Sequence, residues 1–212
     1  MQNRKSYYQR HLPHIIPQGE TFFVTFRLKN TVPLSVIEHL KNKYAQIENE
    51  ICEKNIKEIE KKAYIYDNHK RYFADFDKFL DSNGQKIRHL ENPAIAQIVA
   101  DAIHFYDKKS YQLHSYCIMP NHVHLLITEN IQAEILYKTT ASIKRYSVVR
   151  ANKILQQVGQ PFWADESYDH LVRNEQEFEN INAYILNNPV KAGLVEKWQD
   201  WKFSYCEVSR LL

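Results

Sequence analysis

Residues 120–127, which read Pro-Asn-His-Val-His-Leu-Leu-Ile, decide what the rest of the chain is predicted to form. Because successive side chains of a β-strand point to opposite faces, His122 and His124 share one face, while Val123 and Leu125 share the other. Two imidazoles that converge from a rigid strand are suitable ligands for a divalent metal ion. A His-x-His pair is about as often structural, so the metal interpretation depends on the remaining sequence.

The composition indicates a soluble chain that can bury one core. Of the 212 residues, 44% are hydrophobic and 25% are charged, and only 4 Gly and 7 Pro leave little room for long linkers. We therefore expect a single domain over residues 1–212. The 3 cysteines are too scattered for a disulfide framework or a zinc knuckle. No stretch has the character of a signal peptide or a membrane span, so a cytoplasmic protein is expected.

The chain is mildly basic. A net charge of +3 and a pI near 8.6 permit a nucleic-acid partner without requiring one. Tyrosine can stack on unpaired bases, although its commoner place is the edge of a core. Residues 1–20 are interpreted as an irregular basic arm, in which Arg10 is a candidate contact to phosphate. A frayed terminus is the equally plausible alternative.

The hydrophobic pattern predicts an α+β order of elements. Residues 22–28 are dense in β-branched and aromatic side chains, which indicates a first strand. Residues 33 to about 80 have helical spacing, with a second helical piece over 72–80, and we interpret about 33–90 as a helical insertion after that strand. Asn92-Pro93 then predicts the start of a helix, with Asn as the cap and Pro at the first position.

The second half alternates between strands and helices. The predicted elements are a strand at 111–118, a hairpin turn near 119–121, a strand at 122–128, a helix at 131–155, a loop at 161–166, a strand at 168–173, and a tail at 190–212 that packs on the core. The two strands of the hairpin place the histidine pair on an interior strand.

A last helix is predicted from Asn174, because Glu177 stands three residues later and completes a capping box. Tyr184 and Asn188 are four residues apart, so they lie on one line along this helix. Pro189 disfavours helical geometry at the residue before it, so we expect it to end or distort the helix and Asn188 to lie in the last turn.

The helix predicted over 131–155 carries lysines and arginines with tyrosines between them. Basic and aromatic side chains on one helix suit a phosphate backbone, although a run of lysines is usually just a solvated face. The candidate DNA contacts in the second half of the chain are Lys144, Arg145, Arg150, Arg173 and Lys191.

Two further histidines, His114 and His170, are candidates for contacts to DNA or for support of a ligand. Packed or exposed histidines without such a role are the favoured alternative. Asp169 and Glu166 could orient a ligand histidine through a hydrogen bond.

Several motifs occur together in a fixed order: MPNHVHLL at 119–126, a basic helix, FWADESYDHLVR at 162–173, and YILNNPVKAGLV at 184–195. In this combination the chain resembles the tyrosine transposases with a His–hydrophobic–His motif. The closest branch is the one associated with repetitive extragenic palindromes (REP), related to the small single-strand insertion-sequence transposases. TFFVTFRL at 21–28 and NPAIAQIVADAIHFYD at 92–107 also fit, so the resemblance covers most of the chain.

The resemblance implies a ferredoxin-like fold with a four-stranded antiparallel sheet, whose central strand carries the histidine pair. It implies His122 and His124 as metal ligands and Tyr184 as the nucleophile. Relatives have Gln or Asn four residues after the tyrosine, which makes Asn188 the implied third ligand. The implied cofactor is Mg²⁺ or Mn²⁺.

The activity implied by the resemblance is transposition of single-stranded or hairpin DNA with palindromic repeats. The strand would be cleaved through a 5′-phosphotyrosine intermediate, and a monomer is expected. The first alternative is a catalytically silent, domesticated protein that binds such DNA, and it stays open. A histidine-triad hydrolase would need a third histidine where the chain has Leu126, and a zinc peptidase would need a His-Glu-x-x-His helix, which the sequence lacks.

Overall fold

The chain divides into two units of different architecture. Unit 1 combines Met1–Lys29 with Arg88–Leu212, and unit 2 is Asn30–Ile87. The computed structural model describes residues 7–9, 13–15, 19–83, 87–132 and 136–207. Unit 2 spans nearly the same residues as the helical insertion predicted over about 33–90.

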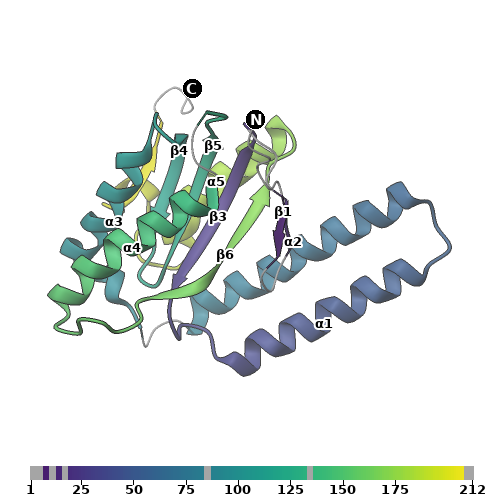
Figure 1. Cartoon of the computed structure of the whole chain (residues 1–212), viewed down its shortest axis with the longest axis horizontal. Helices are drawn as coiled ribbons and strands as arrows, with labels where there is room; N and C mark the ends of the chain where they lie inside the picture. Colours follow the sequence, from purple (N-terminus) through teal and green to yellow (C-terminus); the bar gives the residue numbers. More distant parts are fainter. Residues whose placement is uncertain (1–6, 10–12, 16–18, 84–86, 133–135, 208–212) are drawn as a thin grey trace. The chain divides into compact units, whose positions relative to one another are not determined.

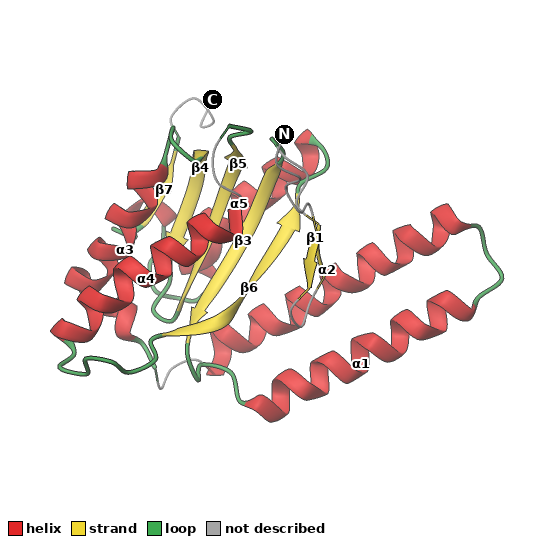
Figure 2. Cartoon of the chain, in the orientation of Figure 1, coloured by secondary structure: helices red, strands yellow, loops and turns green. Residues whose placement is uncertain are grey.

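Unit 1 is built on a five-stranded antiparallel sheet with the strand order β6-β3-β5-β4-β7 (Figure 1; strands are yellow in Figure 2). The strands are β3 (Thr21–Leu28), β4 (Tyr111–Ile118), β5 (His122–Glu129), β6 (Trp163–Leu171) and β7 (Ser204–Cys206). Because β5 is the middle strand, the prediction that the histidine pair lies on an interior strand is confirmed.

The sheet has one strand more than the four that were predicted. The extra strand, β7, comes from the C-terminal tail and pairs with β4. The tail is also attached by two hydrogen bonds: Trp201 Nε1 donates to the Ile118 carbonyl (3.0 Å), and the Ile118 N–H donates to the Phe203 carbonyl (2.9 Å). A strand of three residues is too short to show a period-two pattern, so β7 could not be predicted from the hydrophobic periodicity.

Strand β6 begins earlier than predicted. The segment 161–166 was assigned to a loop, but the strand starts at Trp163, where it pairs with Leu28 after an irregularity in β3. The Trp163 Nε1–H donates to Ser147 Oγ at 2.9 Å. Ala, Asp and Glu are poor strand formers, so tertiary pairing overrides local propensity here.

Two helices cover one face of the sheet and a third covers the other (Figure 1). Helices α3 (Pro93–Tyr106) and α4 (Leu136–Ile154) lie on the first face, and α5 (Glu175–Lys191) lies on the second. The centre of the first face is apolar, and seven side chains of β3 and β5 there are at most 1% exposed: Phe22, Val24, Phe26, Leu28, Val123, Leu125 and Ile127. Each such side chain contributes roughly 1.5–3 kcal/mol when fully buried.

The start of α3 was predicted correctly. Asn92 is its N-cap and accepts a hydrogen bond from the Ala94 N–H at 3.0 Å, with Pro93 at the first position. The start of α4 was predicted at residue 131, whereas the helix begins at Leu136, and residues 133–135 lie outside the described part of the chain.

Helix α5 is capped at both ends. Asn174 Oδ1 accepts from the Glu177 N–H (2.9 Å), and Glu177 Oε2 accepts from the Arg173 N–H (3.0 Å). In a regular capping box Glu177 would instead accept from the N–H of Asn174, the N-cap residue. The helix does not end at Pro189 but continues through it to Lys191, so Asn188 lies in the last turn, as expected. It stops in a Schellman motif, in which Gly193 has φ +68° and the N–H groups of Gly193 and Leu194 reach back into the last turn.

Near the N-terminus, β1 (Tyr7–Gln9) and β2 (Pro13–Ile15) pair as an antiparallel two-stranded sheet. The arm was predicted to be irregular, so this pairing is a correction. Arg10 lies outside the described residues.

Unit 2 consists of α1 (Leu34–Glu53) and α2 (Glu58–Asn83), which pack against each other. Tyr44 Oη donates to Asp75 Oδ2 (2.6 Å), Lys43 Nζ donates to the same oxygen (2.9 Å), and these two hydrogen bonds lower the pKa of the Asp75 carboxyl. Helix α2 starts well before the predicted residue 72. The residues before 72 are mostly polar, so they carry little hydrophobic periodicity, and packing on α1 supports this part of the helix.

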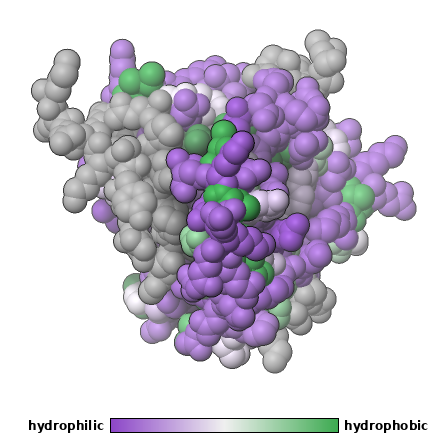
Figure 3. All heavy atoms as spheres, turned by 90° about the vertical axis from the view of Figure 1, so that its right-hand side faces the viewer, coloured by the Kyte–Doolittle hydropathy of each residue, from purple (hydrophilic) through white to green (hydrophobic). Residues whose placement is uncertain are grey.

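No helix in the described ranges is both long enough and apolar enough to cross a bilayer. The face of the molecule drawn in Figure 3 is mainly hydrophilic, with hydrophobic residues in small separate groups.

Candidate metal and tyrosine site

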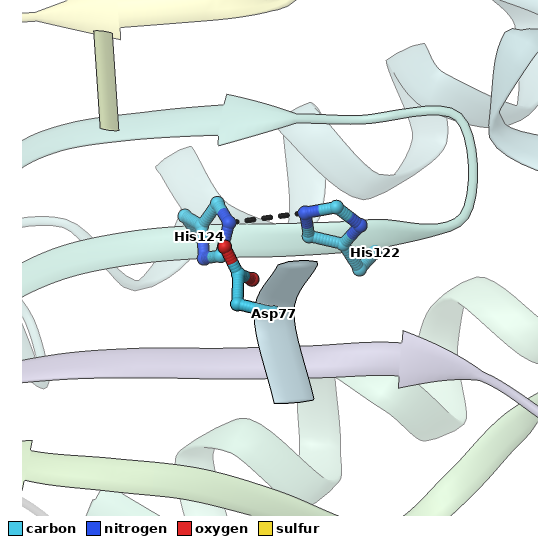
Figure 4. Close-up of side chains that lie close together, drawn as sticks. All are labelled: Asp77, His122 and His124. Carbon is cyan, nitrogen blue, oxygen red and sulfur yellow. Dashed lines mark hydrogen bonds between the residues drawn. The ribbon is translucent and has the colours of Figure 1, made fainter. Parts of the chain in front are cut away.

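The two histidines of β5 converge as predicted. His122 and His124 are 1% and 0% exposed, and their Nε2 atoms are 3.0 Å apart (Figure 4). The ring centroids are 4.6 Å apart at an angle of 72°. Asp77, which Figure 4 also labels, belongs to α2 of unit 2. The pair therefore offers two nitrogen ligands in the directions that a shared cation requires.

Each ring is also held at its other nitrogen. His122 Nδ1 lies 2.6 Å from Asn121 Oδ1, and His124 Nδ1 lies 2.8 Å from Thr25 Oγ1. Thr25 stands directly opposite His124 in the β3–β5 register. All four side chains are at most 5% exposed, so these hydrogen bonds are shielded from competing water.

Burial keeps both imidazoles neutral. It lowers the pKa of His122 to about 3, and the positive charge of Lys191 acts in the same direction. Burial also lowers the pKa of His124, with smaller contributions from His122 and Lys191. A neutral imidazole is the form that coordinates a metal ion, so the environment selects the ligand form at neutral pH.

Tyr184 reaches the same place from α5. Its ring centroid lies 5.5 Å from that of His124 and 6.1 Å from that of Phe23, which it meets edge to face at 86°. Lys191 Nζ lies 5.6 Å from the Tyr184 ring centroid. The side chain is partly exposed, unlike the histidines. The structure therefore brings the predicted tyrosine helix up to the predicted histidine strand.

Asn188 follows Tyr184 by one helical turn and is 0% exposed. Neither Oδ1 nor Nδ2 of this amide has a hydrogen-bond partner among the described residues. A buried polar group left in this state is destabilising by about 1–3 kcal/mol. An amide oxygen is a common ligand of hard divalent cations, so a bound ion would supply the missing interaction.

The spacing of the donors is compatible with a shared cation, since the Nε2 atoms of His122 and His124 are 3.0 Å apart. Together with the amide of Asn188, the residues present fit a divalent cation of the hard, oxygen-accepting kind.

The candidate DNA contacts do not gather at this site. Lys144, Arg145 and Arg150 are on α4, which covers the apolar face of the sheet, whereas Lys191 is on α5. Lys144 Nζ donates to the carbonyls of residues 164, 165 and 166 at 3.0, 3.5 and 3.4 Å, and so ties α4 to β6. The Arg150 guanidinium lies 3.6 Å from the Tyr146 ring centroid.

Arg173, the remaining candidate in the described ranges, is exposed just before α5. Beside it, His170 Nε2 lies 3.2 Å from Glu177 Oε1, and this pair joins β6 to the first turn of α5. His170 therefore helps to fix the helix that carries Tyr184. His114 Nε2 lies 2.7 Å from Thr128 Oγ1, at the other end of β5 from the histidine pair.

The sequence interpretation missed Thr25 and Asn121. The alternation in TFFVTFRL places Thr25 on the same face as Phe23 and Arg27. This alternation does not predict the strand register, which places Thr25 opposite His124 although the two residues are 99 positions apart in the chain. Asn121 immediately precedes the pair, and its side chain could have been considered as an orienting acceptor.

The fold and the site define a class of protein: an α+β chain with a histidine pair on a central strand and a tyrosine on a helix beside it. Residues 86–188 match the family model described as "Transposase IS200 like". The matched segment contains both histidines, Tyr184 and Asn188. The family resemblance expected from the sequence is confirmed over these residues.

Two relatives are named REP-associated tyrosine transposases. The chain is 32% identical over 96 residues to one from Haemophilus influenzae, and 26% identical over 128 residues to one from Escherichia coli. These matches cover 42% and 60% of this chain, and 54% and 67% of the relatives. The chain thus spans about half the length of the first relative and two thirds of the second.

The fold is similar to that of a solved structure, a REP-associated tyrosine transposase bound to a REP hairpin. The TM-score is 0.53 at 17% sequence identity, and the match covers 93% of this chain and 80% of the other. At this level of identity the similarity concerns the fold.

Proposed function

We propose that this protein is a metal-dependent transposase that cleaves and rejoins single-stranded DNA at hairpins, with Tyr184 as the nucleophile. The observation that carries the proposal is the approach of four side chains from two elements. The Tyr184 ring lies 5.5 Å from His124, whose Nε2 is 3.0 Å from that of His122, and the buried amide of Asn188 lies one turn along the helix.

The strand order supports a ferredoxin-like core as the scaffold. Strands β3, β4, β5 and β6 occur in the spatial order β6-β3-β5-β4, with α3 before β4 and α4 before β6. In this proposal β7 is an addition at one edge, unit 2 is an insertion, and residues 1–212 act as one transposase domain.

The proposed ligands of the cation are His122, His124 and Asn188, and the proposed ion is Mg²⁺ or Mn²⁺. When bound, such an ion neutralises charge on a phosphodiester and makes its phosphorus a better electrophile. Two imidazoles and an amide oxygen form a mixed nitrogen and oxygen donor set that suits these ions better than a closed structural zinc site.

The Tyr184 hydroxyl supplies the nucleophile. Its oxygen forms a bond to phosphorus as the bond from phosphorus to the 3′ oxygen breaks, which leaves a 5′-phosphotyrosine and a free 3′-hydroxyl. The phenol proton must leave, and the Lys191 ammonium, 5.6 Å from the ring centroid, favours the resulting negative charge. The covalent bond conserves the phosphodiester, so a second 3′-hydroxyl can reverse the step and join a new strand.

The proposed partner is single-stranded or hairpin DNA with palindromic repeats, bound by a monomer of this chain. Support comes from the similar solved protein, which is bound to a REP hairpin, and from the net charge of +3. The proposed phosphate contacts near α5 are Arg173 and Lys191. On α4 they are Arg145 and Arg150, with Lys144 and the undescribed Arg10 as the remaining candidates.

The test is to incubate the chain with labelled hairpin DNA and Mn²⁺ and to look for a covalent adduct on a denaturing gel. We expect the adduct with the wild type and its loss in Tyr184→Phe. Tyr64→Phe in unit 2 is the matched control, because Tyr64 is an exposed tyrosine on α2, and it should form adduct normally. Adduct formation by Tyr184→Phe would remove Tyr184 from the chemistry. Tight hairpin binding without any adduct would favour the catalytically silent alternative.

A further inference from the structure

We propose that Thr25 and Asn121 are positioning residues of the metal site, which hold the Nδ1 atoms of the two histidines so that both Nε2 atoms face one cation. This inference rests on the proposed metal-binding function. It assigns a task to two buried polar side chains, 4% and 5% exposed, that contact the histidines and would not themselves bind the ion.

Asn121 fixes the protonation pattern of His122. The carbonyl oxygen of an amide can only accept a hydrogen bond, so the 2.6 Å contact between Asn121 Oδ1 and His122 Nδ1 requires the proton on Nδ1. A neutral imidazole with that proton has its free lone pair on Nε2, the atom that points at His124. His122 is therefore held in the tautomer that a metal ion needs.

The turn around Asn121 keeps its side chain in place. The backbone carbonyl of Asn121 accepts from the Leu28 N–H at 2.8 Å, and the Met119 N–H donates to the His122 carbonyl at 2.9 Å. The amide is thus attached to the turn between β4 and β5, which is also hydrogen-bonded to the end of β3. Because the position of Asn121 is fixed by these backbone hydrogen bonds, its side-chain oxygen can orient the His122 ring.

Thr25 serves His124 through a hydroxyl that can both donate and accept. The lone pair on His122 Nε2 accepts the Nε2 proton of His124 across 3.0 Å, so His124 Nδ1 accepts from Thr25 Oγ1 at 2.8 Å. A cation between the rings requires the Nε2 proton of His124 to leave. The neutral ring then carries its proton on Nδ1, and the same hydroxyl, turned about its C–O bond, accepts it.

Thr25 therefore holds the ring in place in both states, with no change in the identity of the partner. A valine at this position has nearly the same shape and suits a β-strand, but it lacks the hydroxyl. Removal of such an orienting partner typically lowers metal affinity roughly 10- to 100-fold.

The chain contains a matched control on the same strand. Thr21 lies on the same face of β3 as Thr25, and its Oγ1 is 2.7 Å from Thr128 Oγ1. Thr21→Val and Thr25→Val thus make the same change on the same strand, and each removes a side-chain hydrogen bond to β5. Only Thr25→Val removes one from a proposed ligand.

The first experiment measures Mn²⁺ affinity of the full chain without DNA, from the electron paramagnetic resonance signal of free Mn²⁺. We expect Thr25→Val to bind roughly 10- to 100-fold more weakly than the wild type. Thr25→Ser, which keeps the hydroxyl, and Thr21→Val should bind within about threefold of the wild type. Asn121→Asp keeps an acceptor and should bind at least as tightly, while Asn121→Ala should be weakened.

The second experiment reads the tautomers of the wild type by NMR of ¹⁵N-labelled histidine and does not depend on any variant folding. Without metal we expect His122 protonated on Nδ1 and His124 on Nε2. Saturation with Mg²⁺ should move the His124 proton to Nδ1. His122 protonated on Nε2 would overturn the role of Asn121, and a His124 that keeps its Nε2 proton with Mg²⁺ bound would overturn that of Thr25.

The outcomes separate this inference from the function on which it rests. If the wild type binds no Mn²⁺ more tightly than His122→Ala/His124→Ala does, the proposed metal site is wrong and its positioning residues fall with it. If the wild type binds Mn²⁺ and a folded Thr25→Val binds it equally well, the metal site stands and the role of Thr25 is refuted.

Discussion

The two faces of the unit 1 sheet are made by alternate residues of the same strands, yet they differ in chemistry. On β3, Phe22, Val24 and Phe26 point to α3 and α4 and are fully buried. The intervening Thr25 and Arg27 lie on the face that α5 covers, opposite His124 and His122. The centre of the first face is apolar, and the second face collects the polar groups that the proposed chemistry needs.

The difference shows how the fold tolerates an unfavourable site. The α5 face buries two imidazoles in the neutral form and an amide, Asn188, without partners among the described residues. The unsatisfied amide of Asn188 lowers stability by about 1–3 kcal/mol, an amount comparable with a modest core mutation. The apolar face offsets that loss, because its side chains contribute roughly 1.5–3 kcal/mol each. Substitutions on the two faces should therefore have separable effects.

The largest effect is expected on the α5 face. His122→Ala/His124→Ala removes both nitrogen ligands and should abolish Mn²⁺ binding and adduct formation. The loss should exceed the roughly 100-fold that removal of an orienting partner produces. The free energy of unfolding without metal should change far less than the affinity does. Mn²⁺ titration and urea unfolding of the same sample measure both; retained affinity would place the ion elsewhere.

A substitution on the apolar face should lower the free energy of unfolding and leave Mn²⁺ affinity nearly unchanged. Phe26→Ala removes a side chain that is 0% exposed and packs edge to face on Trp163, with 5.0 Å between centroids. We expect a loss of about 3–5 kcal/mol in the free energy of unfolding. Mn²⁺ affinity of the folded fraction should stay within about threefold of the wild type. A large drop in affinity would show that the two faces are not independent.

Lower pH should destabilise the metal-free protein through the α5 face. Burial lowers the pKa of His122 to about 3, whereas an unfolded imidazole titrates near 6.5. Between these values the unfolded chain binds more protons, so the free energy of unfolding falls as the pH drops below about 6.5. The loss from this group is about 2 kcal/mol at pH 5. Urea unfolding at pH 7 and pH 5 measures this fall in the free energy of unfolding. The fall should be smaller in His122→Gln, which lacks the imidazole. An equal loss in both proteins would contradict the assignment.

Much of the fold was predictable because it depends on local chemistry. The period-two pattern around His122 and His124 placed both rings on one face, and the caps Asn92 and Asn174 marked where two helices begin. The spacing of Tyr184 and Asn188 placed both on one line of a helix. These features require only that neighbours in sequence be neighbours in space.

What could not be predicted depends on partners that are distant in sequence. The hydrogen bond of Thr25 to His124 needs the strand register, and that of Lys144 to three carbonyls of β6 needs the packing of a helix on a sheet edge. The fifth strand, β7, needs the tail to return to β4. The passage of α5 through Pro189 shows a local rule overridden, since packing and the Schellman motif hold the helix beyond it.

Asn188 should show opposite effects on stability and on binding. Asn188→Leu replaces two unsatisfied polar atoms by an apolar group of similar size, so we expect equal or greater stability, by about 1 kcal/mol. Mn²⁺ affinity should fall at the same time. The control is Asn187→Leu, at an exposed position of the same helix, which should leave affinity unchanged. Lower stability with unchanged affinity in Asn188→Leu would mean that the amide is structural.

The smallest effect is expected at Lys191. Its ammonium lies 5.6 Å from the Tyr184 ring centroid and is exposed, so in a water-like dielectric its attraction for a phenolate is about 0.7 kcal/mol. Lys191→Met should slow adduct formation about threefold at low salt, and the difference should shrink as salt screens the charge. The rate of adduct formation at two salt concentrations measures this. A slower rate that does not depend on salt would point to packing instead of charge.

The central claim is that the strand-borne histidines and the helical tyrosine act on one phosphodiester. Mass spectrometry of the digested protein–DNA adduct tests it most directly, since it locates the residue bonded to the DNA. We predict a 5′-phosphate on the peptide that contains Tyr184, formed only when His122 and His124 are intact. A phosphate linked to any other residue, or adduct on Tyr184 in the absence of both histidines, would contradict the account.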